Sequence, residues 1–297
     1  MKDRFTAYVV DKQDDRVEGR IDSLSPEDLP TGEVTIKVAY SSLNYKDGLA
    51  ATGRGGVVRQ YPHVPGVDAA GTVVASESAD VGVGDRVVVT GYDFGVGSFG
   101  GYAEYARAPA AWVVKMPDTL SDFEAMALGT AGFTAAMCLL AMERNGTTPD
   151  RGPILVTGAT GGVGSIAVDI LAQQGYTVAA STGKPEQHDL LQELGASQIL
   201  SRDDHGGNIA LCGLVAGHDF AGSVIPFLLR GVNLLGIDSV ACPMLYRQTI
   251  WKRLATDLKP RHLQQLARVI TLSELPQAID DILQGKITGR LLVEPRP

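Results

Sequence analysis

The apolar residues follow two different patterns along the chain. From residue 1 to about 120, short apolar runs end at Gly, Pro or Asp, and no helical run separates them. The strands predicted from these runs cover 6–10, 33–40, 71–75, 85–90, 101–107 and 111–115. Many short strands in succession are typical of a small all-β barrel or sandwich.

The pattern changes at Ser121. Ser121 and Glu124 have the spacing of a capping box, and a run rich in Ala, Met and Leu continues to about residue 142, interrupted by Gly129 and Gly132. This run predicts a long, mostly apolar helix.

The next stretch combines both patterns in about thirty residues. It predicts a strand at 154–157, a glycine-rich turn, a helix from about 165 to 174, and a second strand at 177–180. This order is one βαβ unit of the dinucleotide-binding kind. A tight structural turn in an α/β sheet is the alternative interpretation.

The glycine-rich turn is the candidate pyrophosphate site. Gly161, Gly162, Val163 and Gly164 come where free N–H groups and the positive end of the helix dipole would meet an anion. Gly164 would also let the helix approach the strand closely.

The end of the second strand predicts which dinucleotide binds. NAD sites usually place a carboxylate there, whereas this chain has Ser181, Thr182 and Lys184 and no carboxylate before Glu186. Hydroxyls and an ammonium can hold a 2′-phosphate, so NADPH is the predicted cofactor. The alternative is that Lys184 is a solvated charge at a helix start.

The chain that follows this βαβ unit is unusually short for a dinucleotide-binding domain. A helix is predicted at 186–194 and a strand at 198–201, but another apolar strand follows at 208–214, too soon for a parallel crossover of a dozen or more residues. We therefore expect that a segment of roughly 30 to 45 residues, the size of one βαβ unit, is missing between Asp204 and His205. Either the protein has lost this segment by deletion, or the continuous numbering omits residues that are present in the protein. A compact sheet with an Asp204–His205 peptide bond would contradict this.

The C-terminal part again mixes strands and helices. A last sheet strand is predicted at 231–238, a helix at 245–257, and a helix followed by a strand at 271–293.

Composition excludes several classes of protein. The 297 residues carry a net charge of −8 with no run of Lys or Arg, which argues against nucleic-acid or membrane-surface partners. No apolar stretch suits a signal peptide or a membrane span. The three cysteines, Cys138, Cys212 and Cys242, lack metal-ligand spacing. We expect a cytoplasmic protein with reduced thiols.

Five motifs occur in one order along the chain: Ser42-Leu43-Asn44-Tyr45-Lys46-Asp47, Pro65-Gly66-Val67-Asp68, the turn at 82–87, Gly129-Thr130-Ala131-Gly132 and the loop at 159–164. Together they resemble the zinc-independent medium-chain dehydrogenase/reductases of the quinone oxidoreductase-like branch. Residues 229–239 and 251–254 are similar to the NADPH-dependent acrylyl-CoA reductase subfamily in particular. The resemblance covers nearly the whole chain apart from the junction at 204/205.

The resemblance implies a fold and an assembly. The fold class is α/β, with a GroES-like β-barrel catalytic domain over 1–122 and 262–297 and a Rossmann domain, a doubly wound parallel sheet, over 123–261. It also implies a homodimer joined through the last sheet strand near 231–240.

The resemblance also bears on zinc. Zinc-dependent relatives have a Cys in the first motif and Gly-His-Glu in the second, where this chain has Asn44 and Gly66-Val67-Asp68. Two usual ligands are absent, so no zinc is expected, and alcohol oxidation is disfavoured. Reduction of an activated C=C bond is the predicted reaction.

Three residues of the first motif are the predicted catalytic group. Tyr45 is the candidate proton donor or cofactor contact, because a phenol can serve as a positioned acid. Asn44 could hold the nicotinamide amide or the substrate carbonyl, and Asp47 could orient the Asn44 and Tyr45 side chains. Ordinary turn residues at a helix start are the alternative for Asn44 and Asp47.

The predicted cofactor contacts extend over the whole nucleotide-binding half. Thr130 is expected near the nicotinamide, Arg202 near the 2′-phosphate, and Arg290 either at the cofactor or in a surface salt bridge. The nicotinamide pocket is expected to be lined by backbone around Leu211, Cys212 and Gly213 and around Ile237, Asp238 and Ser239.

Three functions remain open from the sequence. The first is reduction of the C=C bond of an α,β-unsaturated acyl-CoA, acrylyl-CoA to propionyl-CoA, for which Arg54 and Arg59 are candidate contacts to the CoA phosphates. The second is an NADPH-dependent quinone or enone oxidoreductase. The third is a non-catalytic NADPH-binding protein.

Overall fold

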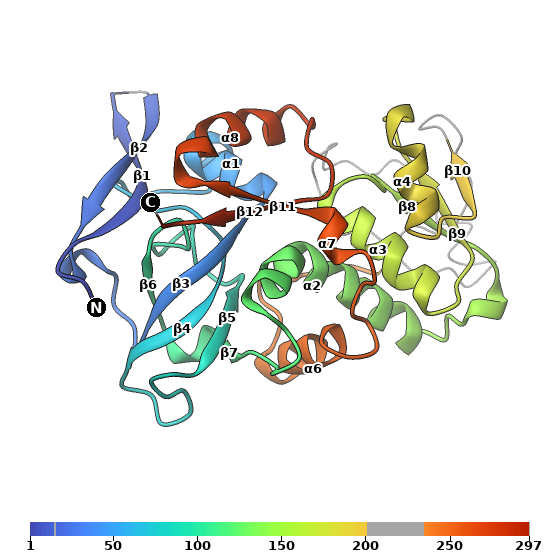
Figure 1. Cartoon of the computed structure of the whole chain (residues 1–297), viewed down its shortest axis with the longest axis horizontal. Coiled ribbons are helices and arrows are strands. Elements are labelled where there is room, and N and C mark those ends of the chain that lie inside the picture. Colours follow the sequence, from blue (N-terminus) through green and yellow to red (C-terminus); the bar gives the residue numbers. More distant parts are fainter. Residues whose placement is uncertain (15, 201–234, 297) are drawn as a thin grey trace.

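The chain forms a β-rich half that carries both termini and a half built of helices around a short parallel sheet (Figure 1). The structure is a computed structural model, and it describes residues 1–14, 16–200 and 235–296. Both halves have the fold class that the sequence predicts.

The β-rich half contains a seven-stranded sheet. Its strands run in the order β11-β12-β3-β4-β5-β7, and β6 pairs with β3. Valines and alanines face inward along these strands, which is why the half closes around a core of its own. The strands are β3 (Val34–Leu43), β4 (Asp68–Ser76), β5 (Arg86–Thr90), β6 (Tyr105–Ala108), β7 (Val113–Lys115), β11 (Ala267–Thr271) and β12 (Arg290–Glu294).

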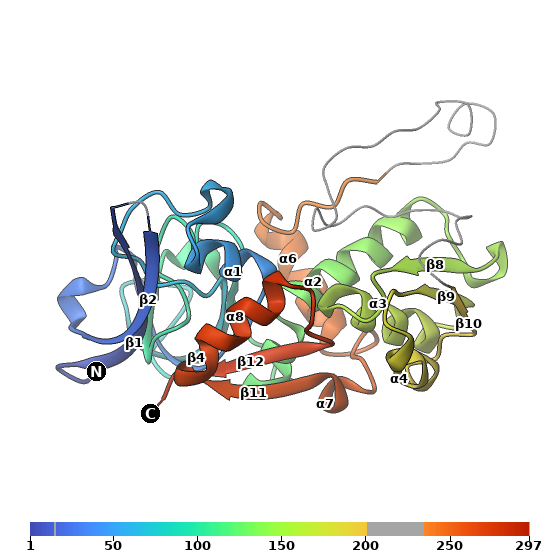
Figure 2. The same cartoon turned by 90° about the horizontal axis from the view of Figure 1, so that it is seen from above.

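The C-terminal segment joins this sheet across a long separation in sequence. β12 lies antiparallel to β3, with Leu292 opposite Ser42, and β11 lies parallel to β12. Helix α8 (Leu275–Leu283) packs beside α1 (Tyr45–Ala51) above the sheet (Figures 1 and 2). The domain boundaries at 122 and 262 stay predictions.

A two-stranded ribbon completes the β-rich half. It consists of β1 (Phe5–Gln13) and β2 (Arg16–Leu24), which pair antiparallel. The sequence predicts only β1, because β2 is mostly exposed and polar and its side chains give no clear alternation.

Helix α2 (Asp122–Arg144) lies at the centre of the molecule. Ser121 Oγ accepts a hydrogen bond from Glu124 N–H at 3.1 Å, and Glu124 Oε2 accepts one from Ser121 N–H at 2.9 Å. The predicted capping box is therefore confirmed. By length and composition α2 could cross a membrane, but 83% of its most apolar 18-residue stretch is buried inside the fold, as expected of a core helix.

The second half contains the predicted βαβ unit. Strands β8 (Ile154–Thr157), β9 (Val178–Ser181) and β10 (Gln198–Leu200) are parallel in the order β10-β9-β8. Helix α3 (Gly162–Gln173) connects β8 to β9, and α4 (His188–Glu193) connects β9 to β10. Helix α6 (Met244–Leu254) and helix α7 (Leu263–Leu266) pack against α2 from the other side.

Two expectations change, and two lie outside the described residues. Helix α3 begins at Gly162, three residues earlier than predicted, so that the glycines themselves form its first turn. Only 235–238 of the strand predicted at 231–238 are described, and they form no strand. The strand at 208–214 and the Asp204–His205 junction lie outside the described residues.

Candidate active site

A small cleft of about 40 Å³ lies where the β-rich half meets the segment before α6. One wall comes from the first turn of α1, the kink of α2 and the loop after β5, and the other comes from the turn that precedes α6. The lining residues are Asn44, Lys46, Val67, Gly91, Tyr92, Phe94, Val96, Thr130, Ser239 and Val240. Asn44, Thr130 and Ser239, which the sequence assigns to the site, therefore meet in one place.

Asp68 organises the β-rich wall of this cleft. Its side chain is fully buried, and its Oδ2 accepts from Asn44 Nδ2 at 2.8 Å and from Ser42 Oγ at 2.5 Å. Its Oδ1 accepts from Thr130 Oγ1 at 2.5 Å, and its Oδ2 also accepts from Thr130 N–H at 2.9 Å. Buried carboxylates need this number of donors to offset their lost hydration. Asp68 thus fixes the two predicted site residues Asn44 and Thr130.

A kink in α2 supplies one of these donors. Gly129 has φ +50° inside the helix, which releases the Thr130 N–H toward Asp68. A Cβ at Gly129 would lie 2.6 Å from Asp68 Oδ2 and 2.8 Å from an Arg290 nitrogen, so only glycine fits here.

Arg290 completes the same buried cluster. It is only 4% exposed, which makes the surface salt bridge considered from the sequence wrong. Its guanidinium donates to Ser42 Oγ at 2.9 Å and to Asn44 Oδ1 at 3.2 Å. A Cβ on Gly162 would lie 3.0 Å from its Nη1, so Arg290 also borders the start of α3. It therefore connects the β-rich wall to the glycine turn.

Asp47 lies at the start of α1 and forms a capping box with Asn44, as the alternative interpretation of these two residues predicts. Its carboxylate is buried and accepts from the N–H groups of Asn44, Gly66 and Val67 at 2.8, 3.1 and 2.9 Å. Burial, followed by the nearby charge of Asp68, raises the pKa of Asp47 to about 7. Asp47 holds the backbone of Asn44 to the 66–67 turn, and no described hydrogen bond connects it to Tyr45.

Tyr45 lies in the first turn of α1 and is half-buried, but its side chain is not among those that line the cleft. The titratable side chains that do line it are Lys46 and Tyr92, which the sequence did not single out. The Tyr92 hydroxyl donates to Cys242 O at 3.3 Å. Tyr45 stays a prediction as the proton donor.

The glycine turn has the features of a pyrophosphate cradle. Gly161 precedes α3 without any side chain to cap it, and the first N–H groups of a helix have no acceptor within the helix. Space is open around Gly158, where an added Cβ would meet no atom within 4 Å. At Gly164 a Cβ would lie 2.3 Å from Gly158 O, so this glycine is needed for close packing of helix and turn. These residues fit a bound diphosphate.

The residues at the end of β9 are partly engaged within the protein. Ser181 and Thr182 are each 6% exposed, and Thr182 Oγ1 lies 3.2 Å from Thr160 Oγ1. Lys184 Nζ donates to Ile287 O at 3.0 Å and Thr288 Oγ1 at 3.3 Å, so the alternative of a purely solvated lysine is wrong. Partial burial lowers the pKa of Lys184. Two of its three donors are used, which leaves one for a ligand.

The remaining predicted contacts divide into two groups. Ser239 lines the cleft, Asp238 Oδ1 accepts from Val240 N–H at 2.9 Å within a turn, and Ile237 packs against the core. Arg202, Leu211, Cys212 and Gly213 lie outside the described residues.

Asn44 and Asp68, which lie in the two motifs that carry ligands in zinc-dependent relatives, are committed to other partners. Asn44 and Asp68 bond to each other and to Ser42, Thr130 and Arg290. Among residues 1–14, 16–200 and 235–296 no group of three or more His, Cys, Asp or Glu is placed to hold a metal ion.

Comparisons with known proteins agree with this architecture. Residues 30–118 match the family model described as the alcohol dehydrogenase GroES-like domain. The chain is 45% identical to YhfP of Bacillus subtilis, named as a quinone oxidoreductase, over 99% of the chain and 100% of YhfP. It is also 45% identical to the acrylyl-CoA reductase AcuI of Ruegeria pomeroyi, over 98% of the chain and 99% of AcuI.

Solved structures show the same fold with nucleotides bound. The yhdH oxidoreductase from Salmonella enterica in complex with NADP gives a TM-score of 0.94 at 41% identity, covering 97% of this chain and 99% of that one. YhfP with NAD bound gives a TM-score of 0.93 at 44% identity, covering 99% of this chain and 100% of that one. The chain belongs to the medium-chain dehydrogenase/reductase family. Within this family of oxidoreductases it groups with the quinone oxidoreductase-like and acrylyl-CoA reductase proteins.

The alignment with YhfP also bears on length. It spans 329 positions against 297 residues here, so at least 32 positions are filled in YhfP alone. This number falls in the range predicted for the missing segment, although the predicted junction lies outside the described residues.

Proposed function

We propose that this protein reduces the C=C bond of an α,β-unsaturated acyl-CoA, acrylyl-CoA to propionyl-CoA, with NADPH. The observation that carries the proposal is the Asp68 cluster, in which Asn44 and Asp68 are hydrogen-bonded to each other and to neighbouring side chains, and which borders the glycine turn through Arg290. Such a wall offers fixed dipoles but no Lewis acid, which suits conjugate reduction better than alcohol oxidation.

The backbone of the glycine turn would hold the cofactor on one side, and the cluster would border it on the other. Bound NADPH would supply a hydride from its C4 to Cβ of the substrate, and the π electrons of the C=C bond would move to the thioester oxygen as an enolate. Gly161, Gly162, Val163 and Gly164 would hold the pyrophosphate, Thr130 and Asn44 would border the nicotinamide, and Ser181, Thr182 and Lys184 would face the 2′-phosphate. Arg202 is a further candidate there. The NADP-bound relative supports this choice, and the NAD-bound one makes it a point to test.

A proton must then reach Cα. Tyr45 is our candidate donor, and Lys46 is the second candidate because its side chain lines the cleft. Asn44 is held rigidly by Asp68 and Arg290, so that it serves as a fixed wall. A Tyr45→Phe variant with full turnover would remove Tyr45 as the acid and leave Lys46→Met to be measured.

A larger hollow supports an extended substrate. It measures about 740 Å³, is lined by Arg59 and Trp112, and shares Val96 with the small cleft. The Tyr92 ring in the cleft stacks on the Trp112 ring in the hollow at 5.7 Å, so the two spaces adjoin. The hollow can take the carrier part of a thioester, with Arg59 available to a phosphate. Arg54 is not among its lining residues.

A quinone or enone oxidoreductase is the second candidate, favoured by the name of YhfP at the same identity as AcuI. The third, a non-catalytic NADPH-binding protein, is disfavoured by the names of the relatives, which are those of oxidoreductases. A homodimer in the cytoplasm is the assembly and location that we propose with the first.

One comparative assay separates these functions. NADPH consumption is followed by absorbance with acrylyl-CoA, crotonyl-CoA and a quinone in parallel. We expect the highest kcat/KM with acrylyl-CoA. A higher value with the quinone would support the second function, and tight NADPH binding without any turnover would support the third.

A further inference from the structure

Arg247 is a buried cation next to the cleft for which the sequence suggests no role. It lies on α6 and is 0% exposed. Its Nη1 donates to Thr90 O and Thr90 Oγ1, both at 2.7 Å, and its Nη2 donates to Ser239 O and Val240 O, both at 3.1 Å. All four acceptors are uncharged oxygens, so the guanidinium charge is not neutralised by them.

These acceptors belong to the two opposite walls of the cleft. Thr90 ends β5 and leads into Gly91 and Tyr92, whereas Ser239 and Val240 form the wall that precedes α6. Tyr92 N–H donates directly to Val240 O at 3.1 Å, and a Cβ on Gly91 would lie 3.0 Å from that oxygen. The walls are therefore in direct contact, and Arg247 donates hydrogen bonds to both of them.

Aromatic rings rather than carboxylates accommodate the charge. The guanidinium carbon lies 4.6 Å from the centroid of the Tyr92 ring and 4.8 Å from that of Phe133. Cation–π contacts of this kind partly offset the cost of burying a cation. Of the ion pairs found among the described residues, none includes Arg247, and its Nε has no hydrogen-bond partner there. Tyr92 separates the charge from the cleft.

We propose that Arg247 is a positioning residue for the reduction: it holds the Tyr92 wall against the Ser239–Val240 wall, and its charge favours the enolate that forms in the cleft beside them. The inference rests on the proposed function. A preorganised charge in a poorly solvated site stabilises a developing anion more than the uncharged substrate, so its effect falls on kcat more than on KM.

The test compares three arginine variants in steady-state reduction of acrylyl-CoA by NADPH. Arg247→Gln removes the charge and the fork, which is the pair of Nη groups that bond to Thr90 on one wall and to Ser239 and Val240 on the other. We expect kcat to fall about 100-fold with KM changing less than about 3-fold. Arg247→Lys keeps the charge and loses the fork, and we expect its kcat to be about 10-fold higher than that of Arg247→Gln. NADPH affinity, measured by nucleotide fluorescence, is expected to stay within about 3-fold in both, because the pyrophosphate cradle is separate.

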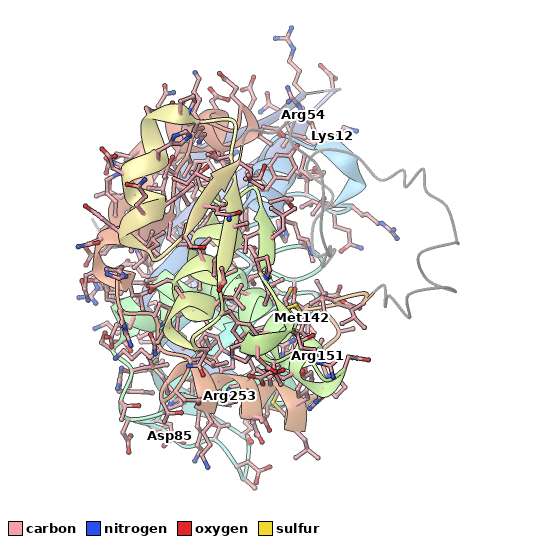
Figure 3. All side chains as sticks on the ribbon, turned by 90° about the vertical axis from the view of Figure 1, so that its right-hand side faces the viewer. Lys12, Arg54, Asp85, Met142, Arg151 and Arg253 are labelled. Carbon is pink, nitrogen blue, oxygen red and sulfur yellow. The ribbon has the colours of Figure 1, made fainter. Side chains whose placement is uncertain are left out.

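Arg253→Gln is the matched control on the same helix. Arg253 pairs with Glu143 at 2.7 Å and with Asp257 at 2.6 Å, and it does not line the cleft. Figure 3 shows it toward the opposite end of that view from Lys12 and Arg54 of the β-rich half. We expect Arg253→Gln to lower thermal stability and leave kcat within about 2-fold.

If Arg247→Gln does not fold, Thr90→Val removes a single acceptor of the fork, and we expect kcat to fall about 5-fold at unchanged NADPH affinity. The inference is overturned if the folded variants keep kcat within 2-fold of the parent, if NADPH affinity falls in proportion to kcat, or if Arg247→Lys does no better than Arg247→Gln. A parent protein that reduces no enoyl thioester would instead refute the proposed function.

Discussion

The two sides of the nucleotide site are built on opposite principles. On the β-rich side, side chains from β3, the start of α1, β4, α2 and β12 form a buried cluster in which Asp68, Asn44 and Arg290 satisfy one another. On the other side, the turn at 158–164 offers its backbone, because its single polar side chain, Thr160, is bonded to Thr182, and the space around Gly158 is free.

This difference assigns separate tasks to the two sides. A satisfied side-chain cluster keeps its geometry without a ligand, and rearranging it is costly because every lost bond leaves a buried group unpaired. Backbone N–H groups at a helix start gain their partner only when an anion arrives. We therefore expect changes on the β-rich side to act on stability and changes on the glycine turn to act on nucleotide affinity.

The largest effect is expected from Gly129→Ala. The substitution forces a side chain into φ +50° and places its Cβ 2.6 Å from Asp68 Oδ2. We expect a loss of about 3 to 5 kcal/mol in the free energy of unfolding, measured with urea. Gly146→Ala, with φ +78° and no atom within 4 Å of the new Cβ, is the control and should lose about 1 kcal/mol. Equal losses would show that the cluster contributes nothing beyond backbone strain.

On the opposite side, Gly164→Ala should weaken nucleotide binding in addition to lowering the stability of the free protein. Its Cβ would lie 2.3 Å from Gly158 O and would push α3 away from the turn. We expect the stabilisation that saturating NADPH gives to the parent, about 3 kcal/mol at 100 times Kd, to be largely lost. Gly161→Ala, whose Cβ meets only Gly158 O at 3.3 Å, should fold with the stability of the parent. Undiminished stabilisation of Gly164→Ala by NADPH would contradict the assignment of the turn.

A smaller effect is expected at the rim, from Lys184→Met. The one ammonium donor left by Ile287 and Thr288 would be lost, and a hydrogen bond to a charged group is worth about 1.5 to 3 kcal/mol. Calorimetry should show Kd for NADPH rising about 10- to 100-fold, with Kd for NADH nearly unchanged. Lys252→Met, on the exposed face of α6, is the control. Equal weakening of both nucleotides would show that Lys184 only supports the 287–288 segment.

The smallest expected effect, about 1.4 kcal/mol between pH 5 and 6, is the pH dependence that Asp47 contributes. Burial and Asp68 raise its pKa to about 7 in the folded protein, above its ordinary value of about 4, so the folded state holds a proton that the unfolded state has released. Stability from this group is therefore full below about pH 4 and falls by about 1.4 kcal/mol per pH unit up to about pH 7. Asp47→Asn should remove this slope between pH 5 and 6 in urea unfolding, and an unchanged slope would mean that Asp47 is ionised throughout.

The sequence predicted the glycine turn and the βαβ unit better than the cluster. The turn and the βαβ unit are local, because about thirty consecutive residues carry their periodicity and their glycines. The cluster joins positions 42, 44, 68, 130 and 290, which no local pattern connects. An aspartate inside the otherwise apolar stretch 67–75 was the available signal for Asp68. Nothing in the sequence showed that Arg290 is buried, that Lys46 and Tyr92 line the cleft, or that exposed β2 and β11 are strands.

The proposed reduction is tested most directly by following the hydride itself. NADPH deuterated at both C4 positions is allowed to reduce acrylyl-CoA in ordinary water, and the propionyl-CoA is analysed by NMR. Our account predicts one deuterium per product molecule, on Cβ, with the new hydrogen on Cα derived from water. Product without deuterium, or with deuterium at Cα, would contradict it.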